Sequence, residues 1–259
     1  MRFIRTRILA YVAIAAVSMT LLAQSARAQD VVMPLPAADQ QVIAAQLGSI
    51  VGDALPSKPL DKASTYFPLH ERTAIYNVTG GRHAGAVQKL GVAKVSRPDG
   101  KSAWRFEMSP SLSAFLNQVD GGDLMMPSLS DAKQGIVVIT TPANPFVLRG
   151  MKPGETRSYA QQVAVYALDD PGDQEYSGSL TGAYTYVGTY RVNVPAGTFD
   201  CVLLRLKVHG KIGPVHTQDM AYYFLSPGKG VIAMINQEDA RAFWIIHIDT
   251  TSGRVLASD

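Results

Sequence analysis

Apolar and polar positions alternate most regularly between residues 184 and 235. Successive side chains of a β-strand point to opposite faces, so Tyr184, Tyr186 and Tyr190 are expected on one face and Thr185 and Arg191 on the other. Such alternation is typical of antiparallel strands with one buried face, because strands of a parallel sheet are covered on both faces and are apolar throughout. We therefore predict consecutive antiparallel strands across this region.

Two turn sequences separate these predicted strands, VPAGT at residues 194–198 and SPGKG at residues 226–230. Proline has a fixed φ that suits a corner, and glycine accepts the positive φ that a tight turn or a bulge requires. Pro195 and Gly197 therefore predict a hairpin between the first two strands, and the second turn predicts another hairpin further along the chain.

The same turns resemble the signature of a family of bacterial cell-envelope proteins of unknown function. The matching segments are VPAGTFD at residues 194–200 and YYFLSPGKGV at residues 222–231, and the resemblance covers roughly residues 151–235. It implies an exported, mostly antiparallel β protein whose sheet is loosely similar to that of periplasmic lipoprotein carriers. The family brings no established catalytic residues to this sequence.

Apolar residues recur at helical spacing over residues 37–55, namely Val42, Ile43, Leu47, Ile50, Val51 and Ala54. Asp39 lies near the start, where a carboxylate complements the helix dipole, and Pro56 ends the pattern. We predict an amphipathic helix that covers one face of the sheet. The proline-rich residues that follow, 57–68, are interpreted as a linker.

The remaining pattern predicts shorter elements along the chain. A second helix is expected over residues 109–119, where Leu112, Phe115, Leu116 and Val119 have helical spacing. A hairpin turn is expected at residues 97–100, a loop around residues 125–127 and a turn at residues 142–145. Strands are predicted at residues 73–78, 86–95, 103–107, 136–140, 156–168 and 242–248.

These elements predict a mainly β fold: a curved antiparallel sheet or half-barrel with an N-terminal amphipathic helix and one short additional helix. The chain of 259 residues divides into a signal peptide (1–28), an N-terminal helix and linker (29–68) and a single antiparallel β domain (69–259). The third segment is long enough to bury a substantial core.

The N-terminus predicts export. Arg2, Arg5 and Arg7 precede an apolar run over residues 8–22, and a small-residue site ends at Ala28. This is the order of a secretory signal peptide for the general export pathway, with cleavage expected after Ala28 and the mature protein expected in the periplasm. The apolar run is short for a membrane span, so no stable span is expected after cleavage. No cysteine follows the cleavage point directly, which argues against a lipid anchor.

Charge then excludes one class of partner. Cleavage removes four arginines and no acidic residue from totals of 24 basic and 21 acidic residues, so the mature chain is near neutral. The sequence pI of about 8.9 belongs to the precursor. We therefore expect no nucleic-acid partner.

Motifs for catalysis, metals and cofactors are missing from the sequence. Cys201 is the only cysteine, so no internal disulfide can form; it is interpreted as a small strand residue or, less favoured, as a reactive thiol. The five histidines lie apart, although His209 and His216 flank a turn and could approach each other as a polar pair. No nucleophile elbow, phosphate loop or dinucleotide fingerprint occurs. We expect no enzyme activity, no metal and no cofactor.

The functional prediction rests on aromatic side chains, because a curved sheet can enclose an apolar cavity and tyrosine adds a hydrogen bond. We predict that the protein binds an amphiphilic or lipid-like molecule in the sheet concavity. The opposing interpretation is that these side chains form the core beneath the N-terminal helix. The predicted ligand-binding residues are Tyr184, Tyr186, Tyr190, Tyr222, Phe224 and Trp244.

Two other functions stay open at this point. One is a structural or assembly protein of the cell envelope that docks a protein partner through an open sheet edge or the helix. The other, least favoured, is a hydrolase whose site the motifs do not reveal.

Overall fold

The computed structural model describes residues 30–96, 102–170, 172–242 and 246–259. The predicted signal peptide and the hairpin turn at residues 97–100 lie outside these residues, as does the middle of the predicted strand at 242–248. In chain order the described elements are β1 (Val31–Val32), α1 (Ala37–Leu47), β2 (Val51–Ser57), α2 (Ala63–Tyr66), β3 (Arg72–Gly80), β4 (Val87–Ser96), β5 (Ser102–Glu107), β6 (Leu112–Gln118), β7 (Leu124–Asp131), β8 (Ile136–Val147), β9 (Thr156–Ala167), β10 (Gln174–Val194), β11 (Gly197–Ile212), β12 (Val215–Ser226), β13 (Gly230–Ala242) and β14 (Ile246–Ser258).

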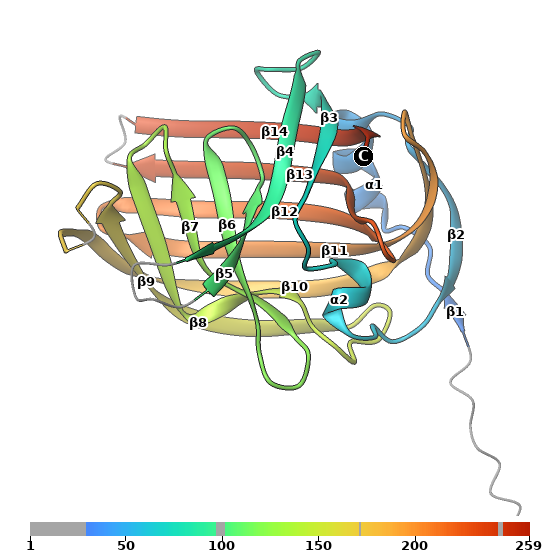
Figure 1. Cartoon of the computed structure of the whole chain (residues 1–259), viewed down its shortest axis with the longest axis horizontal. Coiled ribbons are helices and arrows are strands. Elements are labelled where there is room, and N and C mark those ends of the chain that lie inside the picture. The colour runs from blue at the N-terminus through green and yellow to red at the C-terminus, as the bar shows by residue number, and fades with distance from the viewer. Residues whose placement is uncertain (1–29, 97–101, 171, 243–245) are drawn as a thin grey trace, which may run out of the picture.

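Strands β3 to β14 form a closed antiparallel barrel of 12 strands (Figure 1). Each strand pairs with its neighbour in the chain, β14 pairs with β3, and β9 pairs with β10 to complete the ring. The consecutive antiparallel strands predicted for residues 184–235 are confirmed as β10 to β13. The half-barrel prediction is wrong, because closure satisfies the edge hydrogen bonds that an open sheet would expose.

Strand β10 is long enough to join the barrel to the N-terminal segment. Its first part pairs with β9 up to Thr185, and its last part pairs with β2 around Thr189 and Tyr190. A register shift between Tyr186 and Gly188 separates the two parts. A bulge of this kind bends a strand and changes which face its later residues occupy.

Helix α1 covers residues 37–47 of the region predicted as helical, so the prediction is wrong for residues 48–55. The helix ends at Leu47, where Gly48 has a φ of 73° and its N–H bonds the carbonyl of Ala44. A glycine at this position is a common helix terminator, because positive φ costs it little. The buried residues of α1 are Asp39, Ile43 and Leu47, which form a narrow stripe and not a broad apolar face. Residues predicted to continue the helix form β2 instead.

The second predicted helix, at residues 109–119, is also wrong. This segment forms β6, which pairs with β5 and β7, and its inward residues Ala114 and Leu116 are fully buried. Apolar spacing over so few residues fits a helix and a strand equally, and pairing between strands decided the outcome. The predicted loop at 125–127 and turn at 142–145 likewise lie within β7 and β8.

The proposed linker at residues 57–68 is part of the core. Leu60, Ala63 and Phe67 are at most 2% exposed, and α2 lies beside the barrel wall (Figure 1). The Phe67 ring meets the rings of Phe106 and Phe146 edge-on, with centroids 5.2 and 5.1 Å away. The proline-rich segment is therefore packed against the core, and its prediction as a linker is wrong.

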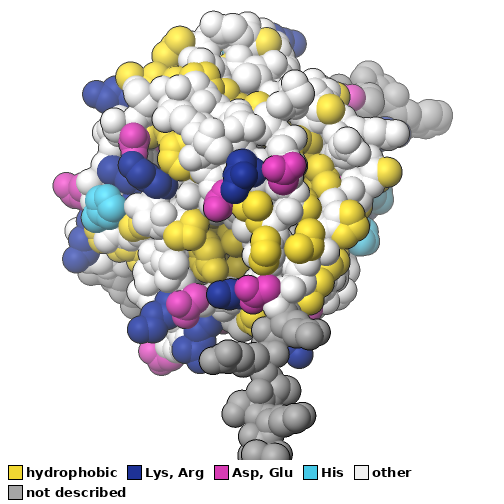
Figure 2. All heavy atoms as spheres, turned by 90° about the vertical axis from the view of Figure 1, so that its right-hand side faces the viewer, with side chains coloured by type: hydrophobic (Ala, Val, Ile, Leu, Met, Phe, Trp, Pro, Cys, Tyr) yellow, Lys and Arg dark blue, Asp and Glu magenta, His cyan; other side chains and the backbone are white. Residues whose placement is uncertain are grey.

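The end of the molecule that carries α1 and β2 is shown in Figure 2. Apolar side chains on this face are divided into small groups by acidic and basic side chains that lie next to one another. Ion pairs between exposed residues contribute little stability individually. Among the described residues, no helix has the length and apolar content needed to cross a membrane.

Candidate functional site

The predicted aromatic face is divided between two sides of the barrel wall. Tyr184 is interior, because its hydroxyl donates to the carbonyl of Phe146 on β8, 2.7 Å away. Tyr222 and Phe224 pair with Arg205 and Leu203, which lie on the outer face. The single aromatic face is therefore wrong. Trp244 lies outside the described residues.

Helix α1 covers the outer aromatic residues. The Tyr222 hydroxyl donates to Oδ1 of Asp39 at 2.8 Å, and burial together with this hydrogen bond raises the pKa of Tyr222. Tyr190, beyond the register shift, pairs with Cys201 on the same outer side and is 1% exposed. These residues form core beneath the N-terminal helix.

The interior near α2 is aromatic and apolar. The Phe146 ring contacts the rings of Phe67, Phe106 and Tyr223, so side chains from α2 and from strands across the barrel meet there. Burial raises the pKa of Tyr223 and of Tyr184. Leu204, Met234 and Leu116 are fully buried and complete this packing.

Two carboxylates line the interior further along β12 and β13. Asp219 is directly opposite Glu238 across the strands, and we call them the acid pair. Burial, followed by the charges of Glu238 and Asp239, raises the pKa of Asp219 to about 6, although Thr217 donates a hydrogen bond to it at 2.9 Å. Burial and the charge of Asp131 on β7 raise the pKa of Glu238. Three acids from two walls of the barrel therefore face one another.

Gln161 is the most isolated polar side chain of the interior. It pairs with Leu180 on the interior face, it is 2% exposed, and neither atom of its amide has a hydrogen-bond partner among the described residues. A buried amide without a partner costs about 1–3 kcal/mol, so such groups need an explanation. Tyr159, one position along β9's interior face, donates to Oδ1 of Asn144 at 3.1 Å.

Arg254 places a buried positive charge on the same interior face. It pairs with Met234 and is 6% exposed. Its Nε donates to Gln88 at 2.8 Å and its Nη1 to Ser252 at 2.9 Å, both neutral partners. Burial lowers the pKa of Arg254. The interior thus joins an aromatic region to a region that holds acids, amides and one guanidinium.

Sequence reasoning missed these polar interior residues. Asp219 and Glu238 stand at positions whose alternation assigns them to the same face as Tyr223 and Met234. Acids at inward positions of an otherwise alternating strand were the available signal. Only strand pairing shows that they meet.

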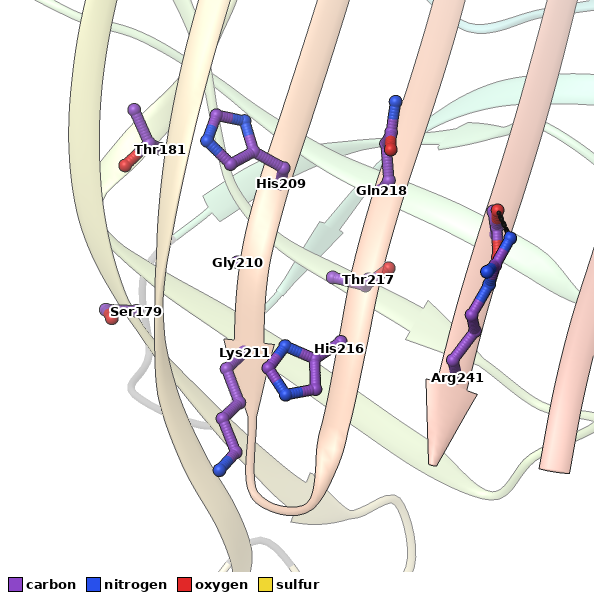
Figure 3. Close-up of a pocket in the computed structure, with 10 residues that line it drawn as sticks. Ser179, Thr181, His209, Gly210, Lys211, His216, Thr217, Gln218 and Arg241 are labelled. Carbon is purple, nitrogen blue, oxygen red and sulfur yellow. Dashed lines mark hydrogen bonds and ion pairs between the residues drawn. The ribbon is translucent and has the colours of Figure 1, made fainter. Parts of the chain in front are cut away.

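A depression on the outer face of β10 to β13 is a second candidate, and we call it the outer depression (Figure 3). It has a volume of about 610 Å³, within the range of small-molecule sites. His209 and His216 both line it, yet they are not directly opposite, since His209 pairs with Gln218 and His216 with Lys211. Its lining residues are Ser179, Thr181, His209, Gly210, Lys211, His216, Thr217, Gln218, Asp239 and Arg241.

Cys201 is fully buried on the outer side of the barrel wall, where it pairs with Tyr190. Burial, followed by the charge of Asp200, raises its pKa. Thiolates are the reactive form of cysteine, so this environment disfavours a reactive thiol.

Comparisons with known proteins add a weak likeness of fold. No family model matches the sequence, and no curated protein matches it, so the resemblance drawn from the two turns stays a prediction. A protein from Parabacteroides distasonis, described as a lipoprotein, matches with a TM-score of 0.33 and 11% identity over 78% of this chain and 99% of its own.

Two further solved structures give similar values. The hypothetical lipoprotein YmcC from Escherichia coli matches with a TM-score of 0.35 and 11% identity, covering 75% of this chain and 86% of its own. An exported protein with a YmcC-like fold from Bacteroides fragilis matches with a TM-score of 0.37 and 11% identity, covering 78% and 98%. At these TM-scores the likenesses assign neither ligand nor activity to this chain.

Proposed function

We propose that the protein is an exported, non-catalytic binding protein that holds an amphiphilic molecule inside its barrel. The ligand's apolar part would lie towards the aromatic region around Phe146, and its polar head towards the acid pair, Gln161 and Arg254. The observation that carries the proposal is Gln161: a buried amide with no partner among the described residues, on the same interior face as three acids.

The energetics of the interior support a binding role. Among the described residues, two facing carboxylates with raised pKa values, an amide without a hydrogen-bond partner and a guanidinium with only neutral partners each lower stability relative to an apolar core. Titratable groups with raised pKa values in a concave interior mark candidate functional sites. An amphiphile whose head contacts the polar region would satisfy these groups and leave the apolar region dry.

The periplasmic location belongs to this proposal. It is supported by the order of charged, apolar and small residues at the N-terminus, which is typical of a cleaved signal peptide. The alternative role, a structural or assembly protein of the cell envelope, has less support. Barrel closure leaves β1, two residues long, as the edge of the described sheet on which a partner strand could add.

The test is native mass spectrometry of protein purified from a periplasmic extract without detergent, followed by solvent extraction of anything bound. We expect a stoichiometric amphiphile in the wild-type protein. Gln161→Leu should reduce its occupancy about tenfold, because the polar head loses its amide partner. Gln162→Leu is the matched control, since Gln162 is the next residue of β9 and is exposed.

Three added probes would define the head group: dodecylamine, dodecanoate and dodecylphosphocholine. Preference for the amine indicates that the acid pair anchors the head, preference for the carboxylate indicates Arg254, and preference for the zwitterion indicates both. If wild-type protein carries no molecule and none of the probes raises its melting temperature, the binding proposal is wrong.

A further inference from the structure

The outer depression differs in charge from the barrel interior. Four side chains that can carry a positive charge line it, Lys211, His209, His216 and Arg241, against one carboxylate, Asp239. The histidines and Lys211 are exposed, and within the described part of the chain no hydrogen bond or ion pair engages their side chains. Uncommitted cationic groups in a concave polar surface are suited to an anion.

Arg241 forms a bidentate pair with a carboxylate on its own strand. Its Nε donates to Oδ1 of Asp239 at 3.0 Å, and its Nη2 donates to Oδ2 at 2.9 Å. This bidentate pair uses Nε and Nη2 of the guanidinium and does not involve Nη1. Guanidinium groups have five N–H donors, so the remaining N–H groups of Arg241 can donate to an oxyanion.

Strand pairing brings the cationic groups into one row. His216 on β12 is directly opposite Lys211 on β11 and directly opposite Arg241 on β13. Figure 3 shows Lys211 and His216 lying next to each other near the β11–β12 hairpin, with Arg241 on the adjoining strand. Neighbouring positions across antiparallel strands are about 5 Å apart, so three donors are spaced along the length of one small ligand.

The surroundings of this row are hydroxyl and amide groups. Ser179 and Thr181 contribute hydroxyls, and Gln218 contributes an amide. Two glycines allow β10 and β11 to approach closely beside the depression: a Cβ at Gly210 would lie 2.2 Å from the carbonyl oxygen of Ser179, and one at Gly178 would lie 2.0 Å from that of Lys211. Both glycines let β10 curve closely over β11.

We infer that the outer depression is a binding site for a small, hydroxyl-bearing oxyanion, such as a sugar phosphate or a sugar acid. Lys211, His216 and Arg241 supply cationic donors along the ligand, of which those nearest the anionic group contact it, and Ser179, Thr181 and Gln218 contact the ligand's hydroxyl groups. This site is distinct from the barrel interior, because its charged side chains lie on the opposite face of the same strands.

The test is a titration of the full protein with glucose 6-phosphate, with glucuronate and with neutral glucose, followed by NMR of the two imidazoles and by calorimetry. We expect saturable binding of at least one anion, weakened when NaCl is raised from about 50 to about 500 mM, and no binding of glucose. Stronger binding of the phosphate ester or of the carboxylate identifies the source of the anion.

Two variants locate the site. Lys211→Ala should weaken the anion's affinity about three- to tenfold, because it removes one charge-assisted hydrogen bond. Lys207→Ala is the matched control, since Lys207 is exposed on the same face of β11 but does not line the depression, and it should change affinity less than twofold. Equal weakening by both variants, equal affinity for glucose, or no saturable shift would overturn the inference.

Discussion

Asp39 of α1 and Arg205 of β11 form a buried ion pair that fastens the N-terminal helix to the outer wall of the barrel. Nη1 of Arg205 lies 2.7 Å from Oδ1 and 2.6 Å from Oδ2 of Asp39, whose side chain is 2% exposed. The Tyr222 hydroxyl donates to the same carboxylate. The residues join segments separated by 166 positions in the chain.

Asp39→Asn should lower the free energy of unfolding by about 2–4 kcal/mol, because it leaves the partly buried Arg205 without this counter-charge. Urea denaturation of the purified protein measures this loss. The matched control is Asp53→Asn, which breaks an exposed pair with Arg191 at 4.0 Å. We expect that variant to lie within about 0.5 kcal/mol of wild type. Equal stability of the two variants would show that the buried pair does not fasten the helix.

Asp219→Asn should stabilise the protein at neutral pH. Because its pKa is raised to about 6 in the fold from an ordinary value of 3.8, folded Asp219 binds its proton more tightly than the unfolded chain does. The contribution of this tighter proton binding to the free energy of unfolding is therefore complete below about pH 4 and is lost as the pH rises through about 6.

The asparagine variant lacks this loss and keeps an acceptor for Thr217. We expect its melting temperature to exceed that of wild type by a few degrees at pH 7.5 and to converge on it near pH 4. Thermal unfolding monitored by circular dichroism across this pH range is the measurement. A difference that is constant with pH would rule out titration of Asp219 as the cause.

Gly182→Ala should destabilise the barrel, because a Cβ there would lie 2.2 Å from Cζ of the Tyr159 ring on the neighbouring strand. We expect a loss of about 1–3 kcal/mol, typical of overpacking. In a Tyr159→Ala background the ring is gone, so the same substitution should cost far less. A double-mutant cycle measured by denaturant unfolding gives this coupling, and purely additive losses would contradict the contact.

Cys201 should resist modification in the folded protein. Its side chain is fully buried, and burial together with Asp200 raises its pKa, so little thiolate is available. Ellman's reagent should therefore leave the native protein unlabelled at pH 8 and should label one thiol per chain in guanidinium chloride. Labelling of the native protein at the rate of a free cysteine would refute the buried assignment.

Local sequence pattern anticipated much of the sheet. The predicted strands at residues 73–78, 86–95 and 103–107 lie within or close to β3, β4 and β5, and the two glycine-containing turns are hairpins. Gly197 has a φ of 134°, and Gly228 and Gly230 also have positive φ. These features depend on a few adjacent residues, so alternation and turn chemistry are sufficient to predict the strands and the hairpins.

The local pattern predicted the wrong element where the same spacing of apolar residues fits both a helix and a strand. Residues 112–118 have helical spacing but also alternate about Ala114 and Leu116, and only neighbours far along the chain make the strand the better solution. The predicted helix over residues 37–55 is too long, because Gly48, with the positive φ that ends α1, precedes Pro56 in the chain.

The sequence by itself determined the antiparallel strands, their turns and which side chains alternate, because these follow from the backbone geometry of neighbouring residues. Only the tertiary structure decided closure of the barrel and the two faces of the aromatic residues. Strand pairing places Tyr184 opposite Leu206 and Tyr222 opposite Arg205, on the other face of β11, and the register shift after Tyr186 places Tyr190 on the outer side with Cys201. Strand pairing likewise joined Asp219 to Glu238 and aligned Lys211, His216 and Arg241, since contact across a sheet depends on register that no single strand encodes.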